Sequence, residues 1–217
     1  MTDAVRDKID KELSKYPRRT YPKGQILVFA DESPAYVFYL VEGRVREYDV
    51  SYRGNEVIVN IFKPNSFFPM SWALNHTPNK YFYKTESATV LHIVPVEAAL
   101  AFAKSNPDVL LDLLSRVYAG MDGLLGRLVH LMSGTAQSRL IFELITGSQR
   151  FGVKAKDGSY LLNSSEVDIA ARSGLSRETV SREMRKLKDE QLVDTSKGNI
   201  SIKSLTKLQN KLGTEEE

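Results

Sequence analysis

Residues 164–193 read SSEVDIAARSGLSRETVSREMRKLKDEQLV and contain two short helical patterns joined by a tight turn. Ser164 or Ser165 is placed to cap the first pattern, and Ser176 is placed to cap the second. Gly174 lies where the chain must reverse, and glycine accepts the positive φ that such a turn needs. The stretch therefore predicts a helix-turn-helix, with an unrelated helical hairpin as the alternative.

The second helix of this pair has two opposed faces. Val180, Met184 and Leu187 are spaced by four and three residues, so they form one buried stripe. Arginine forks onto guanine O6 and N7, glutamate accepts from cytosine N4, and a helix in the major groove presents its N-terminal residues to the bases. We therefore predict that four residues of the opposite face read DNA bases: Arg177, Glu178, Ser181 and Arg182.

Positive charge is concentrated on the same helix. The whole chain carries a net charge of only +3. Residues 176–188 hold a local excess of basic over acidic side chains: Arg177, Arg182, Arg185, Lys186 and Lys188 against Glu178 and Glu183. Such a patch suits a DNA-binding surface, although a charge run taken alone is more often a solvated face. Ser176, Thr179 and Lys186 are predicted to contact phosphates, which position a helix without specifying sequence.

The segments on either side complete a C-terminal domain over residues 135–217. Residues 192–203 alternate polar and apolar side chains around Lys197-Gly198-Asn199, which predicts a β-hairpin wing. Residues 137–145 predict a helix that ends near Gly147, and a polar loop follows it.

The N-terminal part, residues 1–106, has the pattern of short strands. Five segments are rich in β-branched and aromatic residues and are separated by turn residues: 26–30, 36–41, 44–50, 56–62 and 88–94. Gly43 and Gly54 predict tight hairpins. This spacing predicts an antiparallel β-roll with flanking helices, and hence an α+β fold for the chain.

Residues 107–134 predict a long helix and a hinge at Ser133-Gly134. Its apolar residues repeat at spacings close to those of a two-stranded coiled coil: Leu110, Leu113, Val117, Met121, Leu124, Leu128 and Leu131. We predict that they form the interface of a parallel dimer. A helix buried within its own chain is the alternative.

The composition excludes several classes of protein. The chain has no cysteine, which rules out disulfides, cysteine-held iron–sulfur clusters and thiol redox sensing within it. No apolar run is long enough for a membrane span, and the first residues lack the apolar core of a signal peptide. We therefore expect a cytoplasmic protein with no membrane partner.

The order of β-roll, long helix and winged helix-turn-helix resembles the family of the cyclic-AMP receptor protein and the fumarate-and-nitrate-reduction regulator (Crp/Fnr). The resemblance covers about residues 22–203 and rests on PKGQILVFADE, VFYLVEGRV, GNEVIVNIFKP, SATVLHIVPV and above all GLSRETVSR. It implies a homodimeric transcription regulator that binds double-stranded DNA at a palindrome whose half-sites contain TGA. It also implies contact with RNA polymerase, for which the loop at residues 152–163 is a candidate surface.

The chain departs from the cyclic-nucleotide branch of that family in the ligand site. Pro69-Met70 stand where that branch has Gly-Glu, and Lys80-Tyr81 stand where it has Arg-Ser. The glutamate that would accept from a ribose hydroxyl is therefore missing, and cyclic AMP is not the expected effector. The segment offers other residues for an unknown effector: Phe62, Phe67, Phe68, Met70, Trp72, Lys80, Tyr81 and Tyr83. These side chains could equally fill the cavity themselves.

Three functional hypotheses stay open: a ligand-gated regulator, a regulator controlled by its own abundance, and a metal-dependent enzyme on the roll. An enzyme of that kind needs clustered histidine or carboxylate ligands. His76, His92 and His130 are isolated in the sequence. We therefore predict no metal, no cofactor and no catalytic activity.

Overall fold

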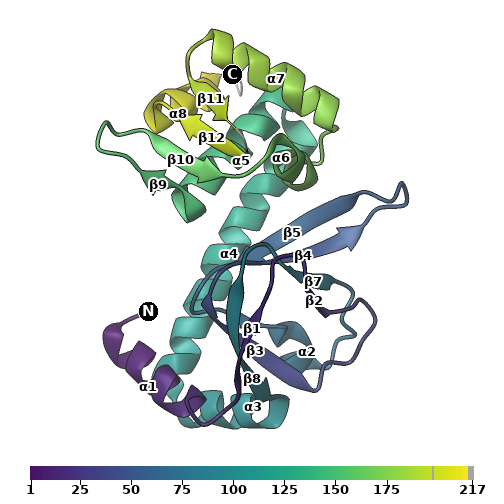
Figure 1. Cartoon of the computed structure of the whole chain (residues 1–217), viewed down its shortest axis with the longest axis vertical. Coiled ribbons are helices and arrows are strands. Elements are labelled where there is room, and N and C mark those ends of the chain that lie inside the picture. The colour runs from purple at the N-terminus through teal and green to yellow at the C-terminus, as the bar shows by residue number, and fades with distance from the viewer. Residues whose placement is uncertain (197, 215–217) are drawn as a thin grey trace. The chain divides into compact units, whose positions relative to one another are not determined.

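The computed structural model describes residues 1–196 and 198–214 (Figure 1). The chain forms two compact units, residues 1–118 and 119–217, and the boundary falls inside the 27-residue helix α4 (Pro107–Ser133). Strands dominate the first unit and helices the second, which confirms the α+β fold class. Among the described residues, no helix combines the length and the apolar character needed to cross a membrane.

Two four-stranded sheets build the N-terminal unit, with strand orders β1-β8-β3-β6 and β2-β7-β4-β5, and neighbouring strands are antiparallel. The strands are β1 (Arg18–Tyr21), β2 (Ile26–Val28), β3 (Tyr36–Glu42), β4 (Val45–Val50), β5 (Glu56–Phe62), β6 (Phe67–Phe68), β7 (Phe82–Thr85) and β8 (Thr89–Pro95). All five predicted strands are present. The sequence pattern does not predict β1, β6 or β7.

Three further helices belong to this unit: α1 (Asp3–Leu13), α2 (Met70–Asn75) and α3 (Val96–Ser105). Buried residues of α1 and α3 form one apolar cluster with side chains of β3 and β8 and with Val109 of α4. A second cluster joins both sheets around Phe68, Tyr83 and Leu91. The first half of α4 is thereby packed onto its own β-roll.

The prediction of a hairpin at Gly43 is wrong. Strand β3 before it pairs with β8 and β6, whereas β4 after it pairs with β5 and β7, so the chain crosses from one sheet to the other. Gly43 has a φ of 91°, and a Cβ there would lie 2.4 Å from the backbone oxygen of Ala88. The crossing therefore requires glycine. The hairpin at Gly54 is confirmed, because β4 and β5 pair directly.

A partly buried carboxylate lies on the sheet that contains β4 and β5. Glu47 of β4 is opposite Asn60 of β5 and Tyr83 of β7, and the Tyr83 hydroxyl donates to Glu47 Oε1 over 2.9 Å. Burial raises the pKa of Glu47 above its ordinary value, even though contacts with Tyr83 and Asn60 act in the opposite direction. The protonated form of Glu47 is therefore favoured by folding.

This raised pKa predicts how Glu47→Gln changes stability. Neutral Glu47 stabilises the fold at acidic pH, and that contribution is lost as the pH rises through the raised pKa. Glutamine remains neutral at every pH. We expect the melting temperature of the variant to match that of the wild type below the ordinary pKa of glutamate. Above that pKa it should exceed the wild-type value by an amount that grows until the pH passes the raised pKa of Glu47 and then stays constant. A pH series of thermal unfolding curves measures this, and a difference that is constant with pH would contradict it.

The C-terminal unit packs helices against a sheet of order β11-β12-β10-β9. Its elements are α5 (Ala136–Phe151), β9 (Val153–Lys154), β10 (Tyr160–Asn163), α6 (Glu166–Ser173), α7 (Arg177–Asp189), β11 (Val193–Ser196), β12 (Asn199–Ile202) and α8 (Leu205–Thr214). Their buried side chains form a single core that includes Ile141, Leu162 and Met184. The predicted wing is confirmed as β11 and β12, and Lys197 of its turn lies outside the described residues.

Two boundaries in this unit differ from the prediction. Helix α5 continues through Gly147 to Phe151. A Cβ at Gly147 would lie 3.1 Å from Leu162 Cδ2, so this glycine permits close packing of α5 on β10 and does not end the helix. The predicted loop at residues 152–163 contains the paired strands β9 and β10.

Candidate DNA-binding site

Helix α6 begins at a capping box. The Ser165 hydroxyl accepts from the Asp168 backbone N–H over 3.2 Å, and Asp168 Oδ2 accepts from the Ser165 backbone N–H over 3.0 Å. Ser165 is therefore the cap, and Ser164 has a different role: its hydroxyl accepts a hydrogen bond from the buried guanidinium of Arg172. The two serines together hold both ends of α6 in place.

The turn and the second cap follow the sequence prediction. Gly174 ends α6 with a φ of 67°, a conformation that glycine adopts without strain. Ser176 caps α7, and its hydroxyl accepts from the Thr179 backbone N–H over 3.1 Å. Leu175 packs against the core of the unit between these two points. The start of α7 is thereby fixed.

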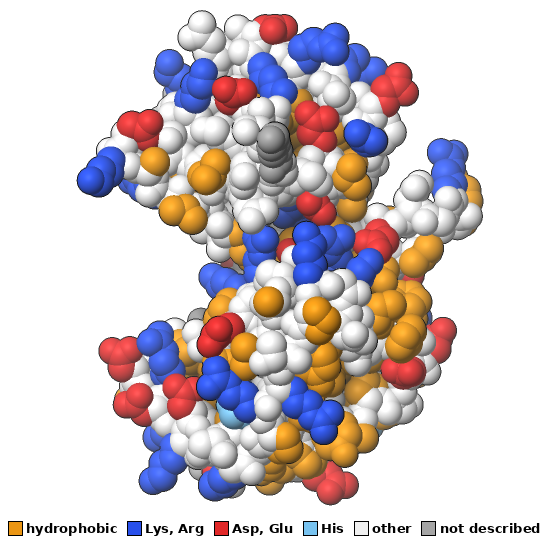
Figure 2. All heavy atoms as spheres, in the orientation of Figure 1, with side chains coloured by type: hydrophobic (Ala, Val, Ile, Leu, Met, Phe, Trp, Pro, Cys, Tyr) orange, Lys and Arg blue, Asp and Glu red, His pale blue; other side chains and the backbone are white. Residues whose placement is uncertain are grey.

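Helix α7 separates its faces as predicted. Val180, Met184 and Leu187 are completely buried. The four predicted base-reading residues, Arg177, Glu178, Ser181 and Arg182, are all exposed on the same helix, as is Lys186. Figure 2 shows Lys and Arg side chains gathered over α7. The helix therefore presents one continuous polar face that is rich in hydrogen-bond donors.

The predicted phosphate-contacting residues lie at two places on α7. Ser176 and Thr179 are at its N-terminus, where their hydroxyl oxygens are 2.9 Å apart. Lys186 is two turns further along, and its Nζ lies 2.8 Å from Glu183 Oε2. The N-terminal hydroxyls lie beside the unpaired N–H groups of the helix, an arrangement that favours an anion.

Glu183 is the residue of α7 that the sequence prediction missed. The sequence shows it only as one of two acidic residues in a basic segment, yet the structure leaves it just 4% exposed. Its Oε1 accepts from Arg182 Nε over 3.2 Å. Burial raises its pKa, but the contacts with Lys186 and Arg182 outweigh burial and lower that pKa below its ordinary value. Glu183 is therefore ionised at neutral pH.

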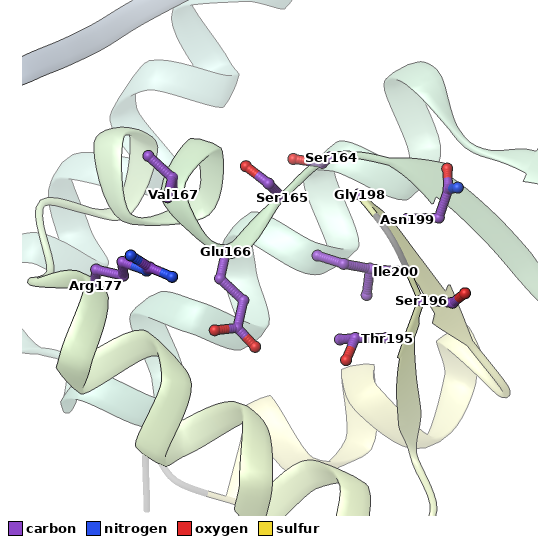
Figure 3. Close-up of a pocket in the computed structure, with 10 residues that line it drawn as sticks. All are labelled: Ser164, Ser165, Glu166, Val167, Arg177, Thr195, Ser196, Gly198, Asn199 and Ile200. Carbon is purple, nitrogen blue, oxygen red and sulfur yellow. The ribbon is translucent and has the colours of Figure 1, made fainter.

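A hollow of about 250 Å³ lies between the helix pair and the wing (Figure 3). Its lining comes from the start of α6, the first turn of α7 and the two wing strands: Ser164, Ser165, Glu166, Val167, Arg177, Thr195, Ser196, Gly198, Asn199 and Ile200. Hydroxyl and amide groups predominate in this lining. Such groups contact phosphate oxygens in many protein–DNA interfaces.

The predicted effector-pocket residues are divided between the two apolar clusters of the N-terminal unit. Phe68 and Tyr83 are stacked with ring centroids 5.5 Å apart, Phe62 lies 5.0 Å from Phe68, and Tyr81 packs against the same cluster. Phe67 and Met70 instead pack with the α1 and α3 cluster. The aromatic rings thus contact one another inside the roll.

The other two predicted pocket residues belong to neither cluster. Trp72 Nε1 donates to the Pro34 carbonyl oxygen over 2.9 Å, and Lys80 is exposed. The histidines are also separate: His76 ends α2, His92 lies on β8 and His130 packs against Phe142. Within the described residues, no group of three or more His, Cys, Asp or Glu side chains is placed to hold a metal ion.

Helix α4 exposes a broad apolar face. Six of the seven predicted interface residues are at least 36% exposed: Leu110, Val117, Met121, Leu124, Leu128 and Leu131. The seventh, Leu113, packs against its own β-roll. A second exposed row runs one residue further along: Leu111, Leu114, Tyr118, Leu125, Val129 and Met132. The face is therefore about twice as wide as the predicted seam.

The second half of α4 is joined to α5 by a buried ion pair. Arg127 Nε lies 2.5 Å from Glu143 Oε1, and Arg127 Nη2 lies 3.3 Å from Glu143 Oε2. The Glu143 side chain is 3% exposed. Phe142 of α5 packs between Gly126 and His130 of α4. Residues 119–133 are thus an integral part of the C-terminal unit.

Comparisons with known proteins agree in both units. Residues 18–106 match the family described as "Cyclic nucleotide-binding domain", and residues 127–211 match the family described as "Crp-like helix-turn-helix domain". The global nitrogen regulator of a Synechocystis species is 25% identical over 92% of this chain and 90% of its own. The transcriptional regulator ArcR of Staphylococcus aureus is 27% identical over 81% of this chain and 75% of its own.

Solved structures show the same fold. A transcriptional regulator of the CRP/FNR family from Thermus thermophilus superposes with a TM-score of 0.76 at 20% identity, covering 92% of this chain and 100% of the other. The regulator CLP of Xanthomonas campestris, described as responsive to c-di-GMP, superposes with a TM-score of 0.79 at 16% identity over 91% of this chain and 98% of its own.

Proposed function

The chain belongs to the Crp/Fnr family of DNA-binding transcription regulators, and we propose that it acts as a homodimer on a palindrome with TGA-containing half-sites. The observation that carries this proposal is the exposed row on α7. Arg177, Glu178, Ser181 and Arg182 are all available at the N-terminal half of a helix whose other face is buried. That half of a recognition helix is the part that meets base edges in the major groove.

The chemistry of the row supports reading of bases over simple attraction to DNA. Arg177 and Arg182 each offer a fork that fits guanine O6 and N7. Glu178 would be repelled by phosphates, but it can accept from the amino group of cytosine. Ser176, Thr179 and Lys186 would hold the backbone, together with the hydroxyl groups that line the hollow beside the wing.

The apolar face of α4 supports the homodimer. Exposed apolar patches of this size are unusual on monomers, and parallel α-helices with this spacing cover each other by coiled-coil packing. A dimer places two copies of α7 about one helical turn of DNA apart, which corresponds to a twofold palindrome. The partner on this face is therefore a second copy of the chain.

We propose that cyclic AMP is not the effector. Pro69-Met70 stand where the cyclic-nucleotide branch has Gly-Glu, so the glutamate that would accept from a ribose hydroxyl is missing. The stacked rings of Phe62, Phe68 and Tyr83 occupy the interior of the roll. This packing favours a regulator that is controlled by its abundance over one that a large ligand gates. Catalysis on the roll has no supporting observation, and we propose none. We propose a cytoplasmic location, because a transcription regulator must have access to the DNA.

We also propose that the β9–β10 hairpin contacts RNA polymerase. Val153 and Leu161 are opposite each other on the two strands and are 69% and 47% exposed. Such paired exposed apolar side chains on a short hairpin suit a protein contact.

The direct test is selection of binding sites from random DNA by the purified protein, followed by affinity measurements with Arg182→Ala. We expect a palindrome with TGA in each half-site to be enriched without any added metabolite. Arg182→Ala should lose about 1–3 kcal/mol on that palindrome for each half-site, because a bidentate base contact is removed. Its affinity for a random duplex should change much less.

The comparison variant is Lys186→Ala. It removes a positive charge from the same helix without removing a predicted base contact, so it should weaken binding to both DNAs and make the salt dependence shallower. Equal losses by Arg182→Ala on the palindrome and on the random duplex would reject the base-reading role. Enrichment only in the presence of cell metabolites would instead identify a ligand-gated regulator.

A further inference from the structure

A buried carboxylate on a DNA-facing helix needs an explanation. Glu183 is 4% exposed, while the side chains of its neighbours Arg182 and Lys186 are 61% and 54% exposed. A carboxylate is almost never buried unless it is paired. A carboxylate near the DNA backbone also opposes binding, so attraction to phosphates does not account for this residue.

Each oxygen of Glu183 lies within ion-pair distance of one of the two cations. Oε1 accepts from Arg182 Nε over 3.2 Å, and Oε2 lies 2.8 Å from Lys186 Nζ. A guanidinium presents its donors in a rigid planar fork. Engaging Nε on one side fixes the plane of the Arg182 fork without consuming the two terminal nitrogens. Those are the nitrogens that donate to guanine O6 and N7 in a bidentate contact.

We propose that Glu183 is a specificity-determining residue that positions Arg182 for base reading and offsets its charge. This inference rests on the proposed function. An arginine that is held in one orientation loses less conformational freedom when it meets its base. The neighbouring negative charge lowers the attraction of Arg182 and Lys186 for any phosphate, so binding to random DNA is weakened. The positioning widens the gap between specific and non-specific DNA, whereas the charge weakens binding to both kinds of DNA.

The test is Glu183→Gln, which keeps the shape of the side chain and removes its charge. We expect the variant to bind the selected palindrome less tightly and a random duplex more tightly than the wild type. The ratio of the two affinities should fall by about ten-fold, the size of one good base contact. The salt dependence of binding to the random duplex should become steeper, because one cation of each chain loses the carboxylate that compensates its charge.

The matched control is Asp189→Asn. It removes one negative charge from the C-terminal end of the same helix, and within the described residues no hydrogen bond or ion pair joins Asp189 to Arg182 or Lys186. It should increase binding to both DNAs alike and leave the ratio unchanged. If Asp189→Asn lowers the ratio as much as Glu183→Gln does, net charge alone explains the effect and the proposal is overturned.

A double-mutant cycle separates positioning from folding. If Glu183 acts through Arg182, adding Glu183→Gln to Arg182→Ala should leave the specificity ratio no lower than Arg182→Ala alone. If the two substitutions together lower the specificity ratio by the sum of their separate effects, the proposal is overturned, because a residue that acts independently of Arg182 would give that result. A wild-type protein that selects no site would instead reject the proposed function itself. A wild-type protein that selects a site, with an unchanged ratio in Glu183→Gln, rejects only the role of Glu183.

Discussion

Leu124→Glu combined with Leu128→Glu is expected to give a folded monomer that has lost at least about a hundred-fold in affinity for the proposed palindrome. Both side chains are about half exposed in the isolated chain, at 51% and 49%, so glutamate is tolerated there. In the proposed dimer the same positions meet their counterparts across a parallel seam. Four carboxylates would then have to be desolvated close together, which costs far more than an interface of this kind supplies.

The measurement is analytical ultracentrifugation alongside DNA binding, with far-UV circular dichroism to confirm the fold. The matched control is Ser115→Glu with Ala119→Glu. Both residues are exposed, have the same spacing and lie off the apolar face of α4, so this variant should remain dimeric. A dimeric Leu124/Leu128 variant would contradict the assignment of this face to self-association.

Glu143→Ala is expected to destabilise the C-terminal unit more than any of the single substitutions proposed on α7. Removing the carboxylate takes away the main charge partner of Arg127, whose side chain is only 16% exposed. Breaking a buried ion pair on one side costs about 3–5 kcal/mol, because the remaining charge stays desolvated. We expect urea unfolding to shift by that amount and hydrogen exchange in α5 to accelerate.

The control for this prediction removes both partners. Arg127→Met with Glu143→Leu replaces the ion pair by apolar side chains of similar size, and it should be close to the wild type in stability. If the double variant is as unstable as Glu143→Ala, packing rather than charge explains the loss. The same double variant would also show whether α4 and α5 keep their alignment when the ion pair is absent.

The helix-turn-helix could be predicted from the sequence because its determinants are local. The serine caps, the positive φ of Gly174 and the spacing of Val180, Met184 and Leu187 each concern residues within one or two turns of helix. The faces of α7 follow from helical periodicity alone. The positions of the four base-reading candidates on an exposed face follow from the same periodicity.

The errors in the β-roll arise from contacts distant in sequence. A glycine with positive φ between two strands has the same local pattern in a hairpin and in a crossing between sheets. Only pairing of β3 with β8 distinguishes the two at Gly43. Gly147 is a similar case, since the reason for glycine lies in Leu162 of another element. Strand β7 was missed because Lys84 and Thr85 interrupt its apolar pattern.

Within the candidate site, Glu183 could not be predicted because its burial depends on neighbouring side chains. A helical wheel places it next to the buried stripe, but only the positions of Arg182 and Lys186 show that its carboxylate is covered and paired. The broad face of α4 is a milder case. The seven-residue repeat selects one row, and the adjacent row becomes apparent only when exposure is known.

The exposed rows of α4 have a consequence for how the protein would respond to its own synthesis. Below the dissociation constant of the proposed dimer, mass action makes the amount of dimer rise with the square of the amount of chain. A twofold rise in expression would then give about a fourfold rise in the DNA-binding species, by the same mass-action relation. In that concentration range, a change in expression of the regulator would cause a larger relative change in the amount of its DNA-binding dimer, and no bound metabolite would be required.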